Sequence, residues 1–192
     1  MMLPPAVNSS GGAYDNPIRK GAEMISKKLN DALNGQINAE LYSSYLYLSM
    51  SAWFSSKSLS GFANWMRIQA QEELFHATKM FDYVNERGGK IVLAAIAKPE
   101  NKWDSPLAVL EQVAQHEAHV TKLINDLVNC ALDERDHASN IFLQWYVSEQ
   151  VEEESSVGDA LNRLKMIGKD SAGMFAMDLE MAKRVFTLPA AE

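Results

Sequence analysis

Cysteine is almost absent from this sequence, with Cys130 alone among 192 residues. A single cysteine excludes an internal disulfide and any zinc site built from several thiolates, and it fits a reducing compartment. We expect Cys130 to be a small buried apolar residue. No segment approaches the ~18 consecutive apolar residues of a membrane helix, and the N-terminus lacks the pattern of a signal peptide. We therefore expect a cytoplasmic protein with no membrane partner.

Positive charge is also scarce, with 18 lysines and arginines against 25 acidic residues and a net charge of −7. A nucleic-acid-binding protein needs a basic face to neutralise phosphates, so this balance argues against a nucleic-acid partner. It is compatible with acidic surfaces that attract cations. The hydrophobic fraction of 47% is enough to bury the core of one domain.

Proline is missing from two long blocks, residues 18–98 and 107–188. Because proline inside a helix costs ~3 kcal/mol, such blocks can contain long helices. Residues 1–22, by contrast, are rich in proline, glycine, serine and asparagine. We predict that they form a disordered N-terminal tail before a single domain at residues 23–188.

Within the domain, apolar side chains recur every three or four residues, which predicts amphipathic helices. No alternation typical of strands competes with this pattern. We expect Ser60 to cap the second helix, and glycines or short polar breaks to end the helices. The four long helices are predicted to begin at about residue 23, at 60, at 106 and after a break at 133–136, and a short fifth helix is predicted at about 171–185.

The lengths of the connections predict the topology. The first and last links are short, so each joins an antiparallel pair of helices. The middle link, at about residues 89–104, can span ~50 Å at ~3.3 Å per residue, which is enough to run the length of the bundle. The sequence therefore predicts an all-α four-helix bundle with one long crossover between helices two and three, plus a short C-terminal fifth helix.

Each predicted helix has an apolar stripe that is interrupted near its middle by acidic and other polar side chains. Four buried carboxylates would be very costly without partners, and no lysine or arginine lies on these stripes at the same level. Two divalent cations would cancel four negative charges, and Fe(II), Mn(II) and Zn(II) all suit oxygen ligands with one imidazole. The pattern predicts a dinuclear metal site. Its residues are Glu40 on the first helix, Glu73 and His76 on the second, Glu117 on the third, and Glu149, Gln150 and Glu153 on the fourth.

Each of these residues also has a plainer interpretation. A lone glutamate is usually a solvated helix position, His76 alone would be a satisfied core histidine, and the acidic fourth helix could be an exposed face. Two other functions remain open: a dimetal enzyme acting on an organic substrate, and a structural bundle whose carboxylates face water. The first would need a pocket of small apolar residues beside the metals.

Four segments are similar to those of a known family: NAELYSSYLYLSMSAW (38–53), AQEELFHA (70–77), QHEAHVTKLINDL (115–127) and FLQWYVSEQVEEE (142–154). From about Met24 to Lys183 the sequence resembles the prokaryotic non-haem ferritins. The resemblance implies a ferritin-like four-helix bundle that self-assembles into a homo-24-mer shell. It also implies an iron-storage ferroxidase, which oxidises Fe(II) with O2 or H2O2 and deposits ferric mineral inside the shell.

The resemblance further assigns roles to individual residues. In the dinuclear ferroxidase centre, Glu73 bridges both irons and Gln150 lies beside the second iron. Tyr47 and Trp145 are candidate electron donors near the centre, and core packing is the alternative for Trp145. The implied iron ligands are Glu40, Glu73, His76, Glu117 and Glu153 in the dinuclear centre, and Glu72, Glu149 and Glu152, with Glu153, in a nearby third iron site.

Two departures distinguish the sequence from related families. The fourth helix lacks the second Glu-x-x-His motif of bacterioferritins and di-iron oxidases. Leu74 stands where bacterioferritins have a haem-binding methionine, so we expect no haem. The remaining histidines, His116, His119 and His137, are expected to lie on the surface.

Overall fold

The computed structural model describes residues 25–187 of the chain, and the predicted tail at residues 1–22 lies outside them. Within this range every regular element is a helix. The elements are α1 (Lys27–Ser56), α2 (Ser60–Glu86), α3 (Pro106–Asp133), α4 (His137–Ile167) and α5 (Ser171–Met181). The predicted all-α bundle with a short fifth helix is therefore confirmed. None of the described helices is both long and apolar enough to cross a membrane.

The helix boundaries follow from side-chain caps. α1 begins at Lys27, later than the predicted residue 23, because the Ser26 side chain accepts a hydrogen bond from the Leu29 amide at 3.2 Å. In the same way, Ser105 caps α3 by accepting from the Ala108 amide at 3.1 Å. α5 ends at Met181, four residues before the predicted end.

The expected cap of α2 by Ser60 is wrong. Ser60 is the first residue of α2 and does not cap it. The N-terminus of α2 is capped instead by a carboxylate that is distant in the sequence. Asp178 of α5 accepts hydrogen bonds from the amides of Gly61 at 2.9 Å and Phe62 at 3.0 Å. A Cβ at Gly61 would lie 1.6 Å from the backbone oxygen of Asp178, so only glycine permits this approach. The cap fixes α5 against the start of α2.

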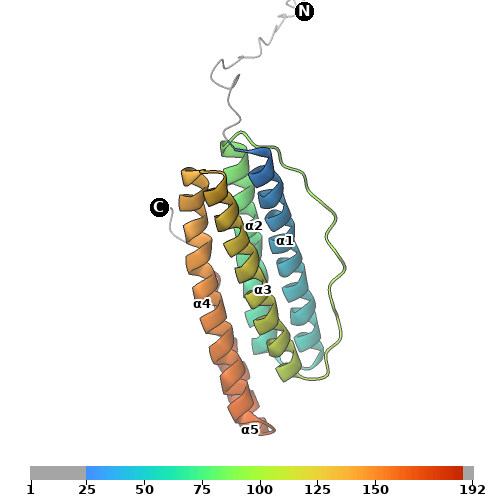
Figure 1. Cartoon of the computed structure of the whole chain (residues 1–192). Coiled ribbons are helices and arrows are strands. Elements are labelled where there is room, and N and C mark those ends of the chain that lie inside the picture. Colours follow the sequence, from blue (N-terminus) through green and yellow to red (C-terminus); the bar gives the residue numbers. More distant parts are fainter. Residues whose placement is uncertain (1–24, 188–192) are drawn as a thin grey trace, which may run out of the picture.

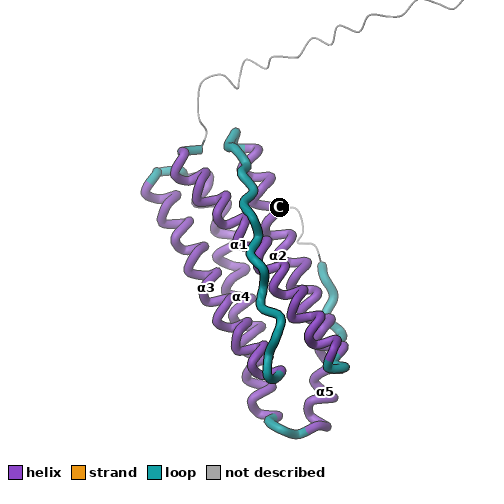
Figure 2. Tube along the Cα trace, turned by 90° about the vertical axis from the view of Figure 1, so that its right-hand side faces the viewer, coloured by secondary structure: helices purple, strands orange, loops and turns teal. Residues whose placement is uncertain are grey.

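α1 and α2 form one antiparallel pair, and α3 and α4 form the other (Figure 1). The crossover between α2 and α3 runs the length of the bundle, as the sequence predicts, and crosses in front of it in Figure 2. Three asparagines spaced four residues apart on α1 fix the crossover backbone. Asn30 donates to the Lys90 carbonyl at 3.1 Å, Asn34 accepts from the Val92 amide at 2.7 Å, and Asn38 donates to the Ala94 carbonyl at 3.3 Å. The crossover is thus held in an extended path without forming a strand.

The buried core consists of two apolar clusters. One contains side chains such as Phe54, Phe62 and Met66, and α5 packs against it. The other contains Leu29, Met80 and Leu143, at the opposite end of the bundle. A band of buried polar residues lies between them, at the level where the sequence predicts the metal site.

Candidate metal centre

On each long helix a glutamate separates the two apolar clusters. On α3, for example, Val113 belongs to one cluster and Val120 to the other, and Glu117 lies between them. The glutamates in this position are Glu40 on α1, Glu73 on α2, Glu117 on α3 and Glu153 on α4, and all four are buried. Because the four interruptions occur at one level, the carboxylates converge in the middle of the bundle, as predicted.

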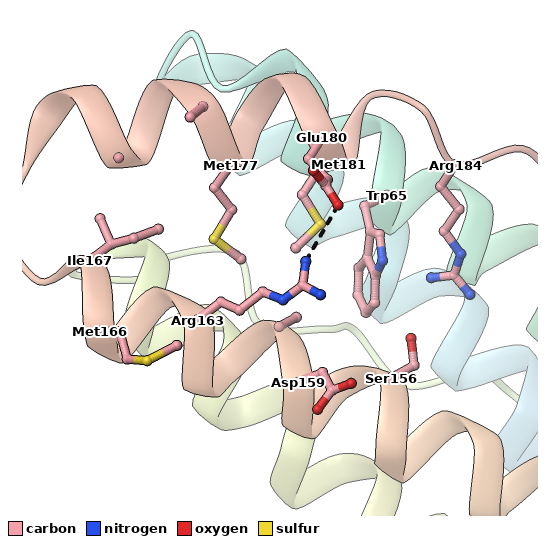
Figure 3. A pocket seen from close by; sticks show the side chains of 13 residues that line it. Trp65, Ser156, Asp159, Arg163, Met166, Ile167, Met177, Glu180, Met181 and Arg184 are labelled. Atoms are coloured by element: carbon pink, nitrogen blue, oxygen red, sulfur yellow. Dashed lines mark hydrogen bonds and ion pairs between the residues drawn. The ribbon is translucent and has the colours of Figure 1, made fainter.

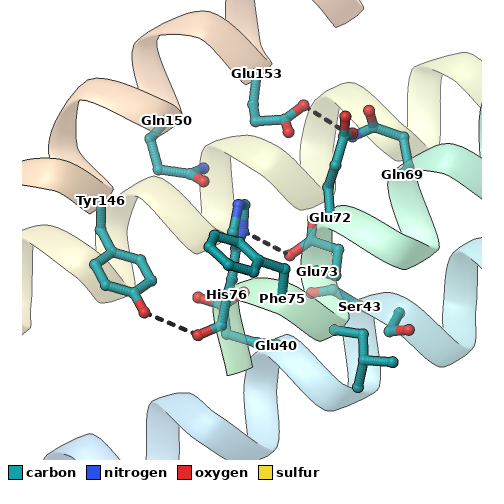
Figure 4. Close-up of polar contacts among 12 residues, drawn as sticks. Glu40, Ser43, Gln69, Glu72, Glu73, Phe75, His76, Tyr146, Gln150 and Glu153 are labelled. Atoms are coloured by element: carbon teal, nitrogen blue, oxygen red, sulfur yellow. Dashed lines mark hydrogen bonds and ion pairs between the residues drawn. The ribbon is translucent and has the colours of Figure 1, made fainter. Parts of the chain in front are cut away.

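We call Glu40, Glu73, His76, Glu117 and Glu153 together the inner cluster, and Glu40, Glu73 and His76 are its tightest group. One potential ligand atom from each lies within 4.8 Å of the other two. His76 Nδ1 is 3.4 Å from Glu73 Oε2, and both side chains are at most 5% exposed (Figure 4). The Gln36 side chain donates to Glu40 Oε1 at 2.9 Å. The second oxygens of Glu40 and Glu73 are buried with no hydrogen-bond partner, so each retains a lone pair that could bind a metal.

Glu117 and Glu153 complete the inner cluster, where amide and phenol groups orient them. The Tyr47 hydroxyl donates a hydrogen bond to Glu117 Oε1, and the Gln150 amide lies 3.3 Å from Glu117 Oε2. The Gln69 side chain donates to Glu153 Oε2 at 2.8 Å. All of these partners are neutral, so none balances the negative charge.

The pKa values show how costly the uncompensated charge is. Burial raises the pKa of Glu73 well above its usual range, and the carboxylates of Glu117 and Glu40 raise it further. Burial raises the pKa of Glu117 to about 8, and the Glu153 carboxylate adds to this effect. Burial lowers the pKa of His76, so its imidazole is neutral and able to donate a lone pair to a metal. The cluster must therefore hold protons on its carboxylates or bind cations.

A second acidic group surrounds a cavity of about 190 Å³ next to the inner cluster, which we call the outer cavity. Glu72, Glu149 and Glu152 line it together with Glu153, as the predicted third iron site requires. Burial raises the pKa of Glu72 to about 7, although the nearby Arg184 guanidinium lowers it. The structure thus brings all the predicted acidic site residues to two adjoining places.

The two predicted aromatic residues also lie at the centre. Tyr47 is completely buried and touches Glu117. Trp145 is partly buried, with its ring edge-on to His76 at 5.3 Å between centroids. Lys79 covers the Trp145 ring at 4.4 Å. Both positions are consistent with electron donation and with packing.

Two expectations about isolated residues need correction. His116 is not a surface residue: its Nε2 lies 2.7 Å from Ser43 Oγ, and its ring packs edge-on to Tyr47. Burial lowers the pKa of His116 to about 4, so its ring is neutral. Cys130 is only partly buried and packs against the second apolar cluster.

Several residues of the site lack a clear sequence signal. Gln36 and Gln69 occupy apolar-stripe positions, where an amide is unusual, and this feature could have identified them as partners of buried carboxylates. Tyr146 donates a hydrogen bond to the His76 carbonyl at 2.8 Å, but its spacing does not distinguish it from a core residue. Arg184 follows α5, and nothing in the local sequence indicates that it reaches the outer cavity.

Comparisons with known proteins agree with this geometry. The family model of the ferritin-like domain matches residues 30–167. The chain is 45% identical over 161 residues to a bacterial non-heme ferritin of Bacteroides fragilis, covering 84% of this chain and 100% of that protein. A bacterial non-heme ferritin of Campylobacter jejuni is 41% identical, with 81% and 93% covered. An open-pore ferritin of Archaeoglobus fulgidus superposes with a TM-score of 0.84 at 54% identity, with 85% and 100% covered.

Proposed function

The chain belongs to the ferritin family, and we propose that it is an iron-storage protein that oxidises Fe(II) to Fe(III) at the inner cluster. One observation carries this proposal. Four buried glutamates converge with one neutral histidine, and none of them forms an ion pair with a lysine or arginine among the described residues. Such a set of oxygens and one imidazole suits Fe(II), and two divalent ions would balance its four charges.

The contacts suggest how the ligands divide. Glu40, Glu73 and His76 would hold one iron, since their ligand atoms already face one another. Glu117 and Glu153 would hold the second, with Gln150 beside it. The carboxylates of Glu117, Glu40 and Glu153 all raise the pKa of Glu73, so Glu73 lies close to the ligands of both ions, which supports its assignment as the shared residue.

The reaction moves electrons from the substrate metal to the oxidant. Two Fe(II) ions each lose one electron, and the pair of electrons, with two protons, converts O2 to H2O2 or H2O2 to two waters. The chain's part is to place the ions together, to give up the protons of its buried carboxylates, and to keep His76 neutral. Tyr47, buried against Glu117, and Trp145, edge-on to His76, would supply a further electron.

Storage requires an enclosed space, and we propose a shell of 24 identical subunits. α5 supports self-association, because Phe175 and Leu179 are 66% and 54% exposed on it, a display of apolar surface that a neighbouring copy would cover. The outer cavity would take a third iron. The proposal includes no haem cofactor and no nucleic-acid or membrane partner. A cytoplasmic location remains a prediction.

Size and iron content together test the proposal. Gel filtration should give a particle of about 500 kDa, from 24 chains of 21.4 kDa, which takes up hundreds of irons after aerobic Fe(II) addition. The variants Glu73→Ala, His76→Ala and Glu117→Ala should slow Fe(II) oxidation while leaving the shell assembled. Glu86→Ala, an exposed change on the same helix as Glu73, is the control. Wild-type oxidation in all three site variants would disprove the site. A small oligomer with about two metals per chain and no mineral would instead indicate a dimetal enzyme.

A further inference from the structure

Among the described residues that line the outer cavity, Arg184 is the only lysine or arginine. Its Nη2 lies 2.6 Å from Glu72 Oε2, and both side chains are less than a quarter exposed. The guanidinium also stacks over Trp65, 4.7 Å from the ring centroid. Its other terminal nitrogen, Nη1, is buried with no hydrogen-bond partner. The guanidinium therefore neutralises one carboxylate while leaving its own hydrogen-bonding capacity incompletely used.

The chain after α5 is folded back so that Arg184 reaches this position. The Asn64 side chain on α2 donates to the carbonyl of Arg184 at 3.0 Å and to that of Ala182 at 3.3 Å. The α2 cap by Asp178 fixes the preceding helix. These contacts hold the backbone, so the guanidinium can move by side-chain rotation alone.

Arg184 also separates the outer cavity from a larger one. Together with Ser156 it lines both the outer cavity and a cavity of about 690 Å³ between α4 and α5, which we call the large cavity (Figure 3). Asp159 supplies a carboxylate to the large cavity, and its other acidic residue, Glu180, is paired with Arg163. A guanidinium that left Glu72 would therefore find both space and negative charge on the other side.

We propose that Arg184 is a displaceable internal cation of the outer cavity. It forms an ion pair with Glu72 when no metal is bound, and it releases Glu72 when a divalent metal binds there. This inference rests on the proposed function. The guanidinium contributes one charge and pairs with one carboxylate, whereas a divalent ion brings two charges and can bind several carboxylates at once. Competition for Glu72 weakens metal binding in the outer cavity, so the inner cluster fills first. Release of the guanidinium removes part of the wall between the two cavities.

Zn(II) titration of the metal-free, assembled protein tests this, because Zn(II) is not oxidised and its binding can be followed to equilibrium. We expect two tight sites per chain and a weaker third. Arg184→Gln should tighten the third site about tenfold, as expected for loss of a charge-assisted ion pair, and leave the first two within about twofold. Arg163→Gln is the matched control. It removes the same charge from a residue that lines the large cavity but pairs with Glu180, and it should change the third site by less than about twofold.

A double-mutant cycle separates competition from general electrostatics. In a Glu72→Gln background, Arg184→Gln should give no further tightening, because the contested carboxylate is gone. Should Arg184→Gln fail to assemble, Arg184→Lys keeps the charge, loses the forked geometry and should tighten the third site about threefold. A structure of the Zn(II)-loaded protein should show Arg184 no longer paired with Glu72.

Several results would overturn the inference. Equal third-site affinity in wild type and Arg184→Gln would do so, as would equal tightening by Arg163→Gln or undiminished tightening in the Glu72→Gln background. Two tight sites without any third would overturn it and leave the proposed ferroxidase centre intact. No Zn(II) binding at all would overturn both.

Discussion

Two polar clusters in this bundle, one buried and one partly buried, are built on opposite principles. At the end of α2 and the start of α4, Arg87 pairs with Asp136 through two contacts, at 2.9 and 3.0 Å. Tyr83 and Ser139 share a hydrogen bond of 2.8 Å in the same cluster. Burial alone would raise the pKa of Asp136, but the Arg87 hydrogen bond holds it below its usual range. We call Tyr83, Arg87, Asp136 and Ser139 the end cluster, and its two opposite charges balance each other.

The inner cluster has the same kinds of polar atoms and the opposite balance. Burial and neighbouring carboxylates raise the pKa values of Glu73 and Glu117, and one oxygen each of Glu40 and Glu73 has no hydrogen-bond partner. Buried carboxylates without a counter-ion usually destabilise a fold, so their presence at one level of four helices indicates a demand for an external cation. Charged side chains away from solvent therefore do not by themselves distinguish a functional site from a structural one. What distinguishes the two is whether the negative charge has a counter-ion within the protein.

The largest contrast should appear when the end cluster is broken. We expect Arg87→Met to lower the free energy of unfolding by about 2 kcal/mol per chain, because it leaves Asp136 partly buried without its counter-ion. Fe(II) oxidation at the inner cluster should stay within about twofold of wild type. Thermal unfolding and initial oxidation rates measure the two effects. The exposed Arg67→Met, also on α2, is the control, and an equal loss of stability in both variants would contradict the assignment.

The sequence predicts the inner cluster better than the end cluster for a physical reason. Glu40, Glu73, Glu117 and Glu153 stand out because each interrupts an apolar stripe, and a four-residue coincidence can be recognised without coordinates. Arg87 and Asp136 lie at helix ends, where charged residues are common and carry no signal. The long crossover is predicted from its length, but the asparagines that hold it are ordinary surface residues of α1 in the sequence.

Contacts between distant segments are the part that the sequence does not provide. The cap of α2 by Asp178 joins residues that are 117 positions apart, so the local rule that favoured Ser60 was wrong. Arg184 reaches Glu72 across 112 positions for the same reason. Helix periodicity specifies which face of a helix is buried, but it does not specify which segment covers a helix end or closes a cavity.

A smaller contrast concerns pH, because the two clusters should respond with opposite signs. The folded-state pKa of Glu117, about 8, lies above its ordinary value, so its contribution to stability is full below that ordinary value and is lost as pH rises toward 8. Asp136 has a lowered pKa, so its contribution is lost as pH falls. We expect the melting temperature of the metal-free protein to fall by several degrees between about pH 6 and 8.5. Zn(II) should remove this fall and release protons, and Glu117→Gln should reduce it. A flat profile for the metal-free protein would contradict the raised pKa.

The smallest and most discriminating test is a matched pair of hydroxyl deletions. Tyr47 donates to Glu117 in the inner cluster, and Tyr83 bonds to Ser139 and Arg87 in the end cluster. Since the Tyr47 hydrogen bond lowers the pKa of Glu117, Tyr47→Phe should make metal binding more dependent on proton loss and slow Fe(II) oxidation about threefold, with little change in melting temperature. Tyr83→Phe should do the reverse, costing about 1 kcal/mol of stability at an unchanged oxidation rate. If both variants lost stability and neither lost activity, Tyr47 would be a packing residue, and the two clusters would differ in charge but not in function.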